Sequence, residues 1–414
     1  MPAPVKSSSK QSSKPASGNK PASKARGPRT CVLHLCPDLE PGDVARETVD
    51  LAILTQRSAG WRTLIASGGG ALVQEAERAA VRHTRMPIGR LGMLTNWRNR
   101  VHLEALIQRE HPSLVHAHGI EALSHALGLC RIHRLPLIAD LTHPIEVTSR
   151  TKKLLQHIAE ANALIRVPSD YLAMELREHF EVPPELILII PPGIDLRWYD
   201  AGATSPERLH ALSRLWRLPE QANVILAPMP LREGSGHKIL MEALKALGRD
   251  DIYAVLVGSD REGTGMREEV EDMIGRYHLS GRVVMPDHCL DWPAAFWLSS
   301  ILVAPNTEPR GQAIELLAAQ AVGRPVIVTD IGANLEMVLS GETAWVVPPN
   351  DAVALADALR EAIDLSSDHR VGLAERTRDF IAESFPQTAW FDAIMDACEL
   401  LLRPAARAVK HKAA

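Results

Sequence analysis

The sequence predicts an α/β protein with two doubly wound, Rossmann-like domains that face each other across a cleft. From Thr30 onward, short apolar segments alternate with amphipathic segments, which is the pattern of parallel sheets flanked by helices. A connector rich in Pro and Gly at residues 191–195 divides this alternation into two blocks. A chain of 414 residues that is 46% hydrophobic is long enough for two domains of ordinary size.

The first block predicts seven strands, each a short apolar run between turn residues. We expect them at residues 30–36, 61–67, 81–86, 114–116, 136–141, 163–167 and 186–190. Apolar residues at helical spacing predict helices near 45–58, 99–110, 122–133, 151–160 and 171–179.

A charged segment, 205–217, leads into the second block. We expect its strands at 224–228, 253–257, 282–285, 301–305, 325–329 and 344–347, and its helices at 238–247, 266–277, 312–321, 352–363, 374–383 and 388–402. The predicted organisation is a tail (1–29), an N-terminal domain (30–200), a C-terminal domain (201–387), a final helix (388–402) and a second tail (403–414).

Charge is distributed unevenly along the chain. The formal net charge is −4, yet both tails contain Lys and Arg without any acid, so residues 30–402 carry −15. The first tail is dominated by Ser, Lys, Pro and Ala, which predicts disorder. Such tails could touch an anionic membrane leaflet or could remain solvated. The acidic body disfavours nucleic-acid binding.

The sequence favours a cytoplasmic protein, with peripheral contact at the inner face of a membrane as an option. No apolar run approaches the roughly 20 residues that span a bilayer, and no signal-peptide core is present. The five cysteines are an odd number, and no pair has metal-site spacing. We therefore expect reduced thiols and no metal or other cofactor.

The run AQAVGRPVIVTDIGANLE at residues 319–336 resembles the donor-site signature of the family-4 retaining glycosyltransferases. Weaker similarities to that family follow in the expected order, at residues 169–172, 182–187, 191–196, 282–295 and 341–351. The resemblance covers about residues 30–402. It implies the two-domain GT-B fold, a final helix that crosses back onto the first domain, and metal-independent transfer from a nucleotide sugar.

The charged groups of the family's donor site are largely replaced in this chain. An Arg and a Lys that the family uses to neutralise the leaving diphosphate correspond to Pro230 and Ser235. Arg232, His237 and Lys238 lie nearby, so a shifted cation could substitute.

Two glutamates of the family, separated by seven residues, correspond here to Arg310 and Ala318. Arg310 reverses a charge near the sugar, and Ala318 offers no acceptor to the ribose. A shifted pair, Glu308 and Glu315, could act as catalytic carboxylates, because Glu315 lies one helical turn before Ala318.

On the first domain, a Gly pair of the family reads Gly42-Asp43, and a carboxylate at position 43 would repel a diphosphate. His143 matches a family histidine that contacts the transferring sugar, although a local hydrogen bond is an equal alternative. The remaining donor-side candidates are His288, Gly332 and Glu336.

Two hypotheses follow from this pattern. The first is a pseudo-glycosyltransferase of cell-envelope glycan assembly (lipopolysaccharide or exopolysaccharide) whose catalysis is impaired or lost. The second is an active glycosyltransferase with a rearranged donor site. A sugar-phosphate isomerase or epimerase on a related scaffold is a third, weaker alternative. The expected partners are a nucleotide sugar, a glycan or lipid acceptor, an anionic membrane surface or another envelope-biosynthesis protein.

Overall fold

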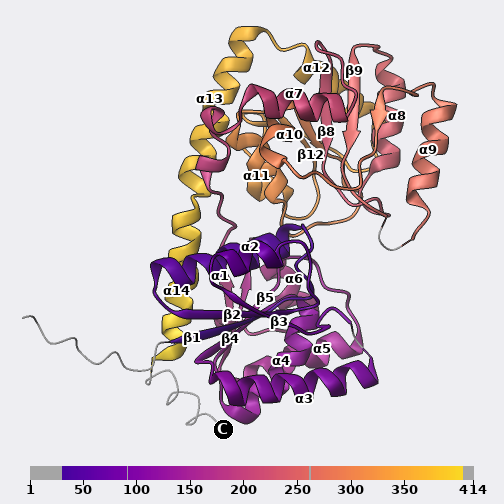
Figure 1. The fold of residues 1–414 in the computed structure, drawn as a ribbon. Coiled ribbons are helices and arrows are strands. Elements are labelled where there is room, and N and C mark those ends of the chain that lie inside the picture. The colour runs from indigo at the N-terminus through magenta and orange to yellow at the C-terminus, as the bar shows by residue number, and fades with distance from the viewer. Residues whose placement is uncertain (1–29, 91, 261–262, 404–414) are drawn as a thin grey trace, which may run out of the picture.

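The protein consists of two parallel sheets, each flanked by helices (Figure 1). The structure is a computed structural model that describes residues 30–90, 92–260 and 263–403. The first sheet has seven strands in the order β3-β2-β1-β4-β5-β6-β7, and the second has six in the order β10-β9-β8-β11-β12-β13. In both, the chain starts at a central strand and winds outward in both directions, so the predicted pair of doubly wound domains is confirmed.

The first sheet is formed by β1 (Cys31–Leu35), β2 (Arg62–Ser67), β3 (Arg82–Arg85), β4 (Leu114–His118), β5 (Leu137–Asp140), β6 (Ala163–Val167) and β7 (Ile187–Ile189). Its helices are α1 (Asp43–Ser58), α2 (Val73–Arg78), α3 (Met93–Glu110), α4 (Ile120–His133), α5 (Ser149–Gln156) and α6 (Asp170–Phe180). Short 3-10 turns lie at η1 (His157–Glu160), η2 (Pro184–Leu186), η3 (Leu196–Trp198) and η4 (Ala201–Ala203).

The second sheet is formed by β8 (Asn223–Ala227), β9 (Ile252–Leu256), β10 (Val283–Val284), β11 (Ile301–Ala304), β12 (Val326–Thr329) and β13 (Ala344–Val347). Its helices are α7 (Pro206–Leu215), α8 (His237–Leu247), α9 (Met266–Arg276), α10 (Trp292–Leu298), α11 (Ile314–Ala321), α12 (Ala352–Ile363) and α13 (Ser367–Ser384), with a 3-10 turn η5 (Asn334–Met337). The last helix is α14 (Gln387–Leu402).

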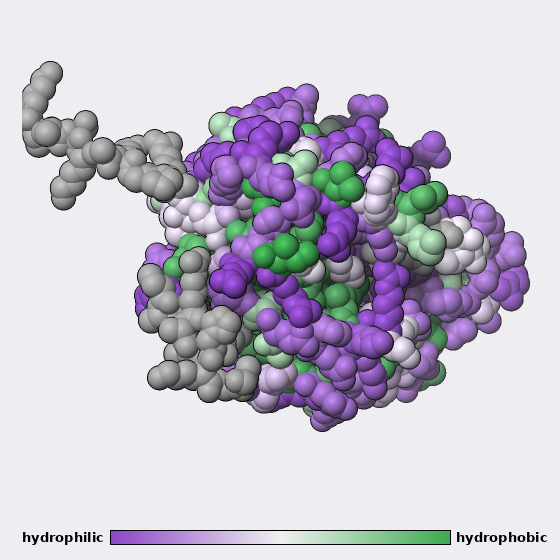
Figure 2. Space-filling view, turned by 90° about the horizontal axis from the view of Figure 1, so that it is seen from below, coloured by the Kyte–Doolittle hydropathy of each residue, from purple (hydrophilic) through white to green (hydrophobic). Residues whose placement is uncertain are grey.

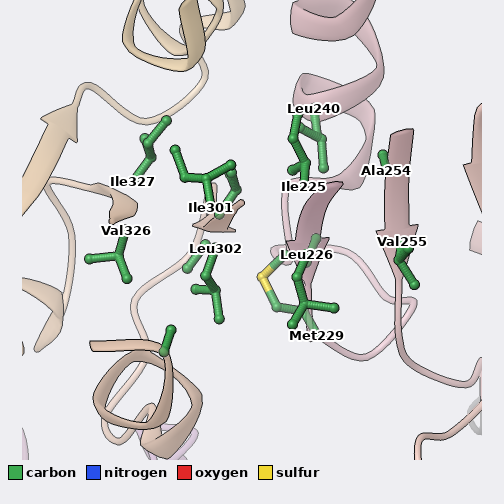
Figure 3. Close-up of a cluster of buried hydrophobic side chains, with 14 of the residues drawn as sticks. Ile225, Leu226, Met229, Leu240, Ala254, Val255, Ile301, Leu302, Val326 and Ile327 are labelled. Atoms are coloured by element: carbon green, nitrogen blue, oxygen red, sulfur yellow. The ribbon is translucent and has the colours of Figure 1, made fainter. Parts of the chain in front are cut away.

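The core of the second domain explains why its strands are continuous apolar runs. Both faces of the sheet are covered by helices, so side chains on both sides of a strand are buried. Figure 3 shows β8 between β9 and β11, with Leu240 of α8 close to the sheet. The residues labelled there are all buried: Ile225, Leu226, Met229, Leu240, Ala254, Val255, Ile301, Leu302, Val326 and Ile327.

The structure departs from the predicted elements at several helices. Helix α3 begins at Met93, six residues before the predicted start, because its first turns expose their apolar side chains and so lack a buried stripe. Strand β4 continues to His118, beyond the apolar run. Helices α2 and α10 were not predicted, because each is too short for its apolar periodicity to be read. Helix α7 was not predicted either, and it lies in the segment 205–217, which was described only as charged.

The chain crosses between the domains twice, and the two crossings are hydrogen-bonded to each other. The amide of Ile194 donates to the Phe385 carbonyl at 2.9 Å, and the amide of Gln387 donates to the Ile194 carbonyl at 3.2 Å. Gly193 is required here, since a Cβ would lie 2.6 Å from Trp390. Helix α14 then runs along the N-terminal domain (Figure 1), as the family resemblance implied.

Helix α14 completes the core of the first domain. Its buried residues Trp390, Ile394 and Leu401 pack against apolar side chains of β1, β4, β5 and β6. The side chains it covers on those strands are Val32, Leu114, Ile138 and Leu164.

A buried carboxylate, Glu47 of α1, connects this helix to the sheet and to the second domain. It accepts hydrogen bonds from Arg166 Nη1 of β6 at 2.8 Å, Trp390 Nε1 of α14 at 2.9 Å and Gln312 Nε2 of the C-terminal domain at 2.9 Å. Arg166 also donates to Asp140 Oδ1 at 2.9 Å, and the side chains of Arg166, Glu47 and Asp140 are almost wholly buried. We refer to Glu47 and its three donors as the Glu47 hub.

Burial raises the pKa of Glu47, and the charge of Arg166 offsets this only in part. For Asp140, burial acts in the same direction, but Arg166 outweighs it and holds the pKa of Asp140 below its ordinary range.

The predicted tails at 1–29 and 404–414 lie outside the described residues. Of the second predicted tail, only Arg403 is described, and its amide closes α14. None of the helices in the described part of the chain combines the length and apolar character that crossing a bilayer requires.

Glu47→Gln is expected to destabilise the protein by about 3 kcal/mol, because a buried guanidinium loses one of its two carboxylates. Asp357→Asn is the matched control, since it removes one member of the exposed Arg360–Asp357 pair and should cost less than about 1 kcal/mol. Urea denaturation followed by tryptophan fluorescence measures both. Equal midpoints for the two variants would show that the Glu47 hub does not hold the fold together.

Candidate functional site

The carboxyl ends of both sheets face a shared interface, where ligands of doubly wound proteins bind. The N-terminal domain contributes the start of α1 and the loop after β5, and the C-terminal domain contributes the loop between β11 and α11. The two loops touch at Gly311, where a Cβ would lie 2.2 Å from the Thr142 carbonyl oxygen and 2.5 Å from Leu172. Only a glycine allows this approach.

On the first domain, Asp43 and His143 form an ion pair at this interface. His143 Nε2 lies 3.2 Å from Asp43 Oδ2. Burial alone would lower the pKa of His143, but the Asp43 carboxylate outweighs it and raises that pKa. Burial would likewise raise the pKa of Asp43, yet His143, with a smaller contribution from Arg310, holds it well below its usual range. His143 is thus engaged in the local contact considered from the sequence.

The second domain contributes another ion pair to this interface. Arg310 Nη1 lies 2.7 Å from Glu315 Oε1, and both side chains are largely buried, with 13% and 15% exposed. The charge of Asp43 also raises the pKa of Arg310, so two carboxylates stabilise the positive charge of this guanidinium. We refer to Asp43, His143, Arg310 and Glu315 as the interface charge cluster. Every cation in this cluster already has a carboxylate partner.

Two further side chains bridge the domains. Gln312 donates to Glu47 across the interface, 265 positions away in sequence. Glu336 accepts hydrogen bonds from the backbone amides of Asp170 and Tyr171 at 2.7 and 2.8 Å, which places a carboxylate at the N-terminus of α6. That helix terminus favours negative charge. Glu336 was expected on the donor side. In this structure its carboxylate is hydrogen-bonded to the first domain.

The cations proposed as substitutes for the family's Arg and Lys occupy different environments. Burial lowers the pKa of His237 to about 4, so it is neutral near pH 7. Lys238 lies 3.0 Å from Glu233 and 2.6 Å from Glu269. Arg232 is exposed, and it has no carboxylate partner among the described residues.

At the two replaced cation positions, Pro230 is exposed and Ser235 is buried. The loop that holds them turns through Gly234 and Gly236, both with positive φ. Glu308 lies against this loop, because a Cβ on Gly234 would meet its carboxylate at 2.3 Å. Glu308 is therefore close to the N-terminus of α8, where the sequence placed the diphosphate.

Ala318, which corresponds to the second glutamate of the family, does not face the interface. It is 1% exposed and belongs to the core of the C-terminal domain, because α11 turns that side toward β11 and β12. Glu315, one turn earlier, is the α11 residue that reaches the interface charge cluster.

The other donor-side candidates are spread over the interface and the surface. Gly42 precedes α1 as its N-cap. Gly332 has a φ of +62° and packs on the Arg310 backbone, where a Cβ would lie 2.5 Å from the Arg310 oxygen. His288 is exposed in the loop after β10.

A cluster of three buried histidines lies beneath α1, on β1 and β4. Donor atoms of His34, His116 and His118 lie within 4.8 Å of one another, a spacing that could hold a metal ion. His34 Nδ1 lies 3.1 Å from His118 Nε2, and His118 Nδ1 lies 3.4 Å from Asp140 Oδ2. Arg166 donates a hydrogen bond to Asp140, and its positive charge would repel a divalent cation bound beside these histidines. Burial holds the pKa of His34 and of His116 well below the ordinary range, which favours their neutral forms. The absence of a bound metal stays a prediction.

Sequence reasoning did not identify Glu47, Gln312, Asp140 or Arg166 as parts of the interface. Gln312 directly follows Gly311, and Glu47 lies one helical turn after Asp43, so their proximity to candidate residues was the available signal.

The fold and the position of the site define a GT-B architecture. Two glycosyltransferase family profiles match the chain, one described as "Glycosyltransferase Family 4" over residues 48–198 and one as "Glycosyl transferases group 1" over residues 222–364. Together with the relatives below, these matches support a GT-B glycosyltransferase.

Curated relatives carry glycosyltransferase names. A Salmonella typhimurium protein, provisionally named as the colanic acid biosynthesis glycosyltransferase WcaL, is 29% identical over 268 residues. That match covers 61% of each chain, so this chain aligns with about six tenths of the relative's length. A D-inositol 3-phosphate glycosyltransferase of Kineococcus radiotolerans is 24% identical over 383 residues, covering 82% of this chain and 83% of the relative.

Solved structures share the fold at low identity. A glycosyltransferase from Rickettsia africae has a TM-score of 0.79 at 19% identity and covers 91% of this chain and 99% of its own. Anabaena HepE in complex with UDP-glucose has a TM-score of 0.76 at 19% identity, with coverages of 90% and 100%.

Asp43→Asn is expected to lower the pKa of His143, because burial would then act without the carboxylate that opposes it. In the wild-type protein, the stabilisation from this pair is complete below the unfolded His pKa of about 6.5 and is lost as pH rises through the higher folded value. NMR titration of the His143 ring, assigned with His143→Gln, measures the shift. Glu175→Gln, at the distant His179 pair, should leave His143 unchanged. An unaltered pKa in Asp43→Asn would contradict the ion pair.

Gly311→Ala is expected to separate the domains, because the new Cβ would overlap the Thr142 carbonyl oxygen. The overlap and the loss of the Gln312–Glu47 hydrogen bond should lower the free energy of unfolding by about 1–3 kcal/mol. Small-angle X-ray scattering should show a larger radius of gyration. Gly128→Ala in α4 is the control, since a Cβ there meets nothing within 4 Å. Identical scattering from both variants would show that the interface does not depend on this contact.

Proposed function

We propose that this chain is a GT-B glycosyltransferase-like protein of cell-envelope glycan assembly whose affinity for nucleotide-sugar donors is low and whose transfer activity is impaired. The interface charge cluster carries this proposal. A nucleotide sugar brings a diphosphate, and productive transfer requires cations that stabilise its developing charge. Here Arg310 is paired with Glu315, His143 with Asp43, and Lys238 with two glutamates.

The size of the expected loss follows from these pairings. Removing two positively charged groups from a phosphate site ordinarily costs several kcal/mol of transition-state stabilisation, which is a rate loss of roughly a thousandfold or more. Asp43 adds a negative charge where the family has glycine. Glu336 also occupies an amide pair at a helix N-terminus, a group that could otherwise bind an anion.

An active glycosyltransferase is the second candidate, and Glu308 and Glu315 favour it. Glu308 lies against the loop before α8, and Glu315 lies in the first turn of α11. Both carboxylates are therefore near the places where a donor's phosphates and sugar would lie. Opening of the domains would give a ligand access to Arg310 and His143 in this case, and each would keep the carboxylate partner on its own domain.

The proposed substrate class is supported by the names of the relatives. These names refer to colanic acid biosynthesis, D-inositol 3-phosphate and phosphatidyl-myo-inositol. We propose a glycan or lipid acceptor of the cell envelope and a position in the cytoplasm, peripheral to the inner face of the membrane. The retaining stereochemistry of any transfer belongs to the same proposal.

Calorimetry with UDP- and GDP-sugars tests the function. The wild-type protein should bind them weakly, and Asp43→Gly with Pro230→Arg should bind at least tenfold more tightly, about 1.4 kcal/mol, because the pair of changes adds two positive units at the interface. Glu342→Arg makes the same change in net charge at the opposite, amino-terminal edge of β13 and should leave binding unaltered.

Donor binding by the two glutamate variants, measured beside hydrolysis and transfer, separates the two candidates. Micromolar donor binding by the wild-type protein, abolished by Glu308→Ala or Glu315→Ala, would overturn the impaired-donor proposal and establish the active enzyme with shifted carboxylates.

A further inference from the structure

The first half of α3 exposes four large apolar side chains. Met93 is 91% exposed, Leu94 80%, Trp97 65% and Val101 48%. Their spacing of one, four and eight residues from Met93 places them along one side of a helix. Exposed apolar residues scattered singly are ordinary, but a contiguous group marks an interaction surface.

These side chains do not belong to the core of the domain. The buried residues of α3 begin only at Asn99 and continue through Leu103, Leu106 and Ile107. Asn99 fixes the helix by donating to the Pro87 carbonyl at 3.0 Å. Met93, Leu94 and Trp97 therefore extend from a helix that is anchored by its second half.

The surroundings of this face are basic. Residues 78–103 contain six arginines and no Asp or Glu, although residues 30–402 as a whole carry a formal charge of −15. Arg90, Arg98 and Arg100 are exposed, and none of the three has a carboxylate partner in the described part of the chain. The positive charge on this side of an acidic body is thus free to meet an external anion.

We propose that the first half of α3 docks on an anionic lipid bilayer. We name the surface formed by Met93, Leu94, Trp97 and Val101, with Arg98 and Arg100, the α3 face. Apolar side chains including a tryptophan would enter the boundary between headgroups and acyl chains, and the arginines would contact lipid phosphates. Each cation near such a surface adds to the attraction, and its contribution falls with salt.

The position of α3 agrees with this orientation. In Figure 1, α3 lies along the side of the N-terminal domain away from the C-terminal domain. Figure 2 looks at the molecule from that side and shows hydrophobic side chains grouped among hydrophilic ones. A bilayer there leaves the domain interface free. The inference rests on the peripheral membrane position proposed above and names the surface that makes the contact, and it does not depend on whether sugar is transferred.

Charge argues against a second copy of the chain as the occupant. A symmetric dimer through the α3 face would place the same arginines opposite each other, and like charges in contact oppose association. An anionic bilayer satisfies the apolar and the charged groups together.

Co-sedimentation of the full chain with vesicles of phosphatidylglycerol and phosphatidylcholine tests the proposal. Binding should require the anionic lipid and weaken with salt. Leu94→Ser with Trp97→Ser should weaken it at least tenfold, and Arg98→Gln with Arg100→Gln should weaken it and reduce its salt dependence. Trp198→Ser is the matched control, because that tryptophan is 64% exposed elsewhere and should not contribute.

Several outcomes would overturn the inference. If the α3 variants bind as the wild-type chain does while deletion of residues 1–28 abolishes binding, the tail and not the α3 face is the anchor. If Trp97→Ser converts a dimer to a monomer in sedimentation velocity without changing vesicle binding, a second copy is the occupant. Binding to neutral vesicles with equal strength would exclude the electrostatic part. Circular dichroism should show all variants folded, since the substituted side chains are exposed.

Discussion

The arrangement of the whole molecule depends on one buried carboxylate. Glu47 accepts hydrogen bonds from the first sheet, from the returning helix and from the second domain, through Arg166, Trp390 and Gln312. An unpaired charge at such depth would be very unfavourable, and the three donors offset part of the cost of burying this carboxyl group. The hub therefore couples the internal packing of the first domain to the position of the second.

A similar principle governs the interface between the domains. Its charges neutralise one another: Asp43 faces His143, Arg310 faces Glu315, and Glu336 caps α6. Each pair is favourable without a ligand, so a diphosphate would have to compete with an existing carboxylate for each cation. We attribute the proposed weak donor binding to this competition as well as to the replacement of the family's Arg and Lys by Pro230 and Ser235.

Most of the fold could be predicted from the sequence, because buried parallel strands are short apolar runs and buried helices carry an apolar stripe. The interface was less predictable, because partners there are distant in sequence. Gln312 and Glu47 are separated by 265 positions, and nothing in either segment indicates the other. The ion pair between Lys238 and Glu269 was equally unpredictable, since the residue type alone does not show whether a lysine has a carboxylate partner. The burial of Ala318 was also not predictable, because a spacing matched to a family motif does not determine which side of α11 faces the core.

The double crossing of the chain has a consequence for biosynthesis. The strands of the first domain leave the ribosome early, but the apolar surface formed by Val32, Leu114, Ile138 and Leu164 is completed by α14, at the other end of the chain. At about 5–20 residues per second, translation from Ile190 to Leu401 takes on the order of 10–40 s. During that interval the apolar sheet face of the nascent first domain lacks its last covering helix, and such transiently exposed surface is prone to aggregation.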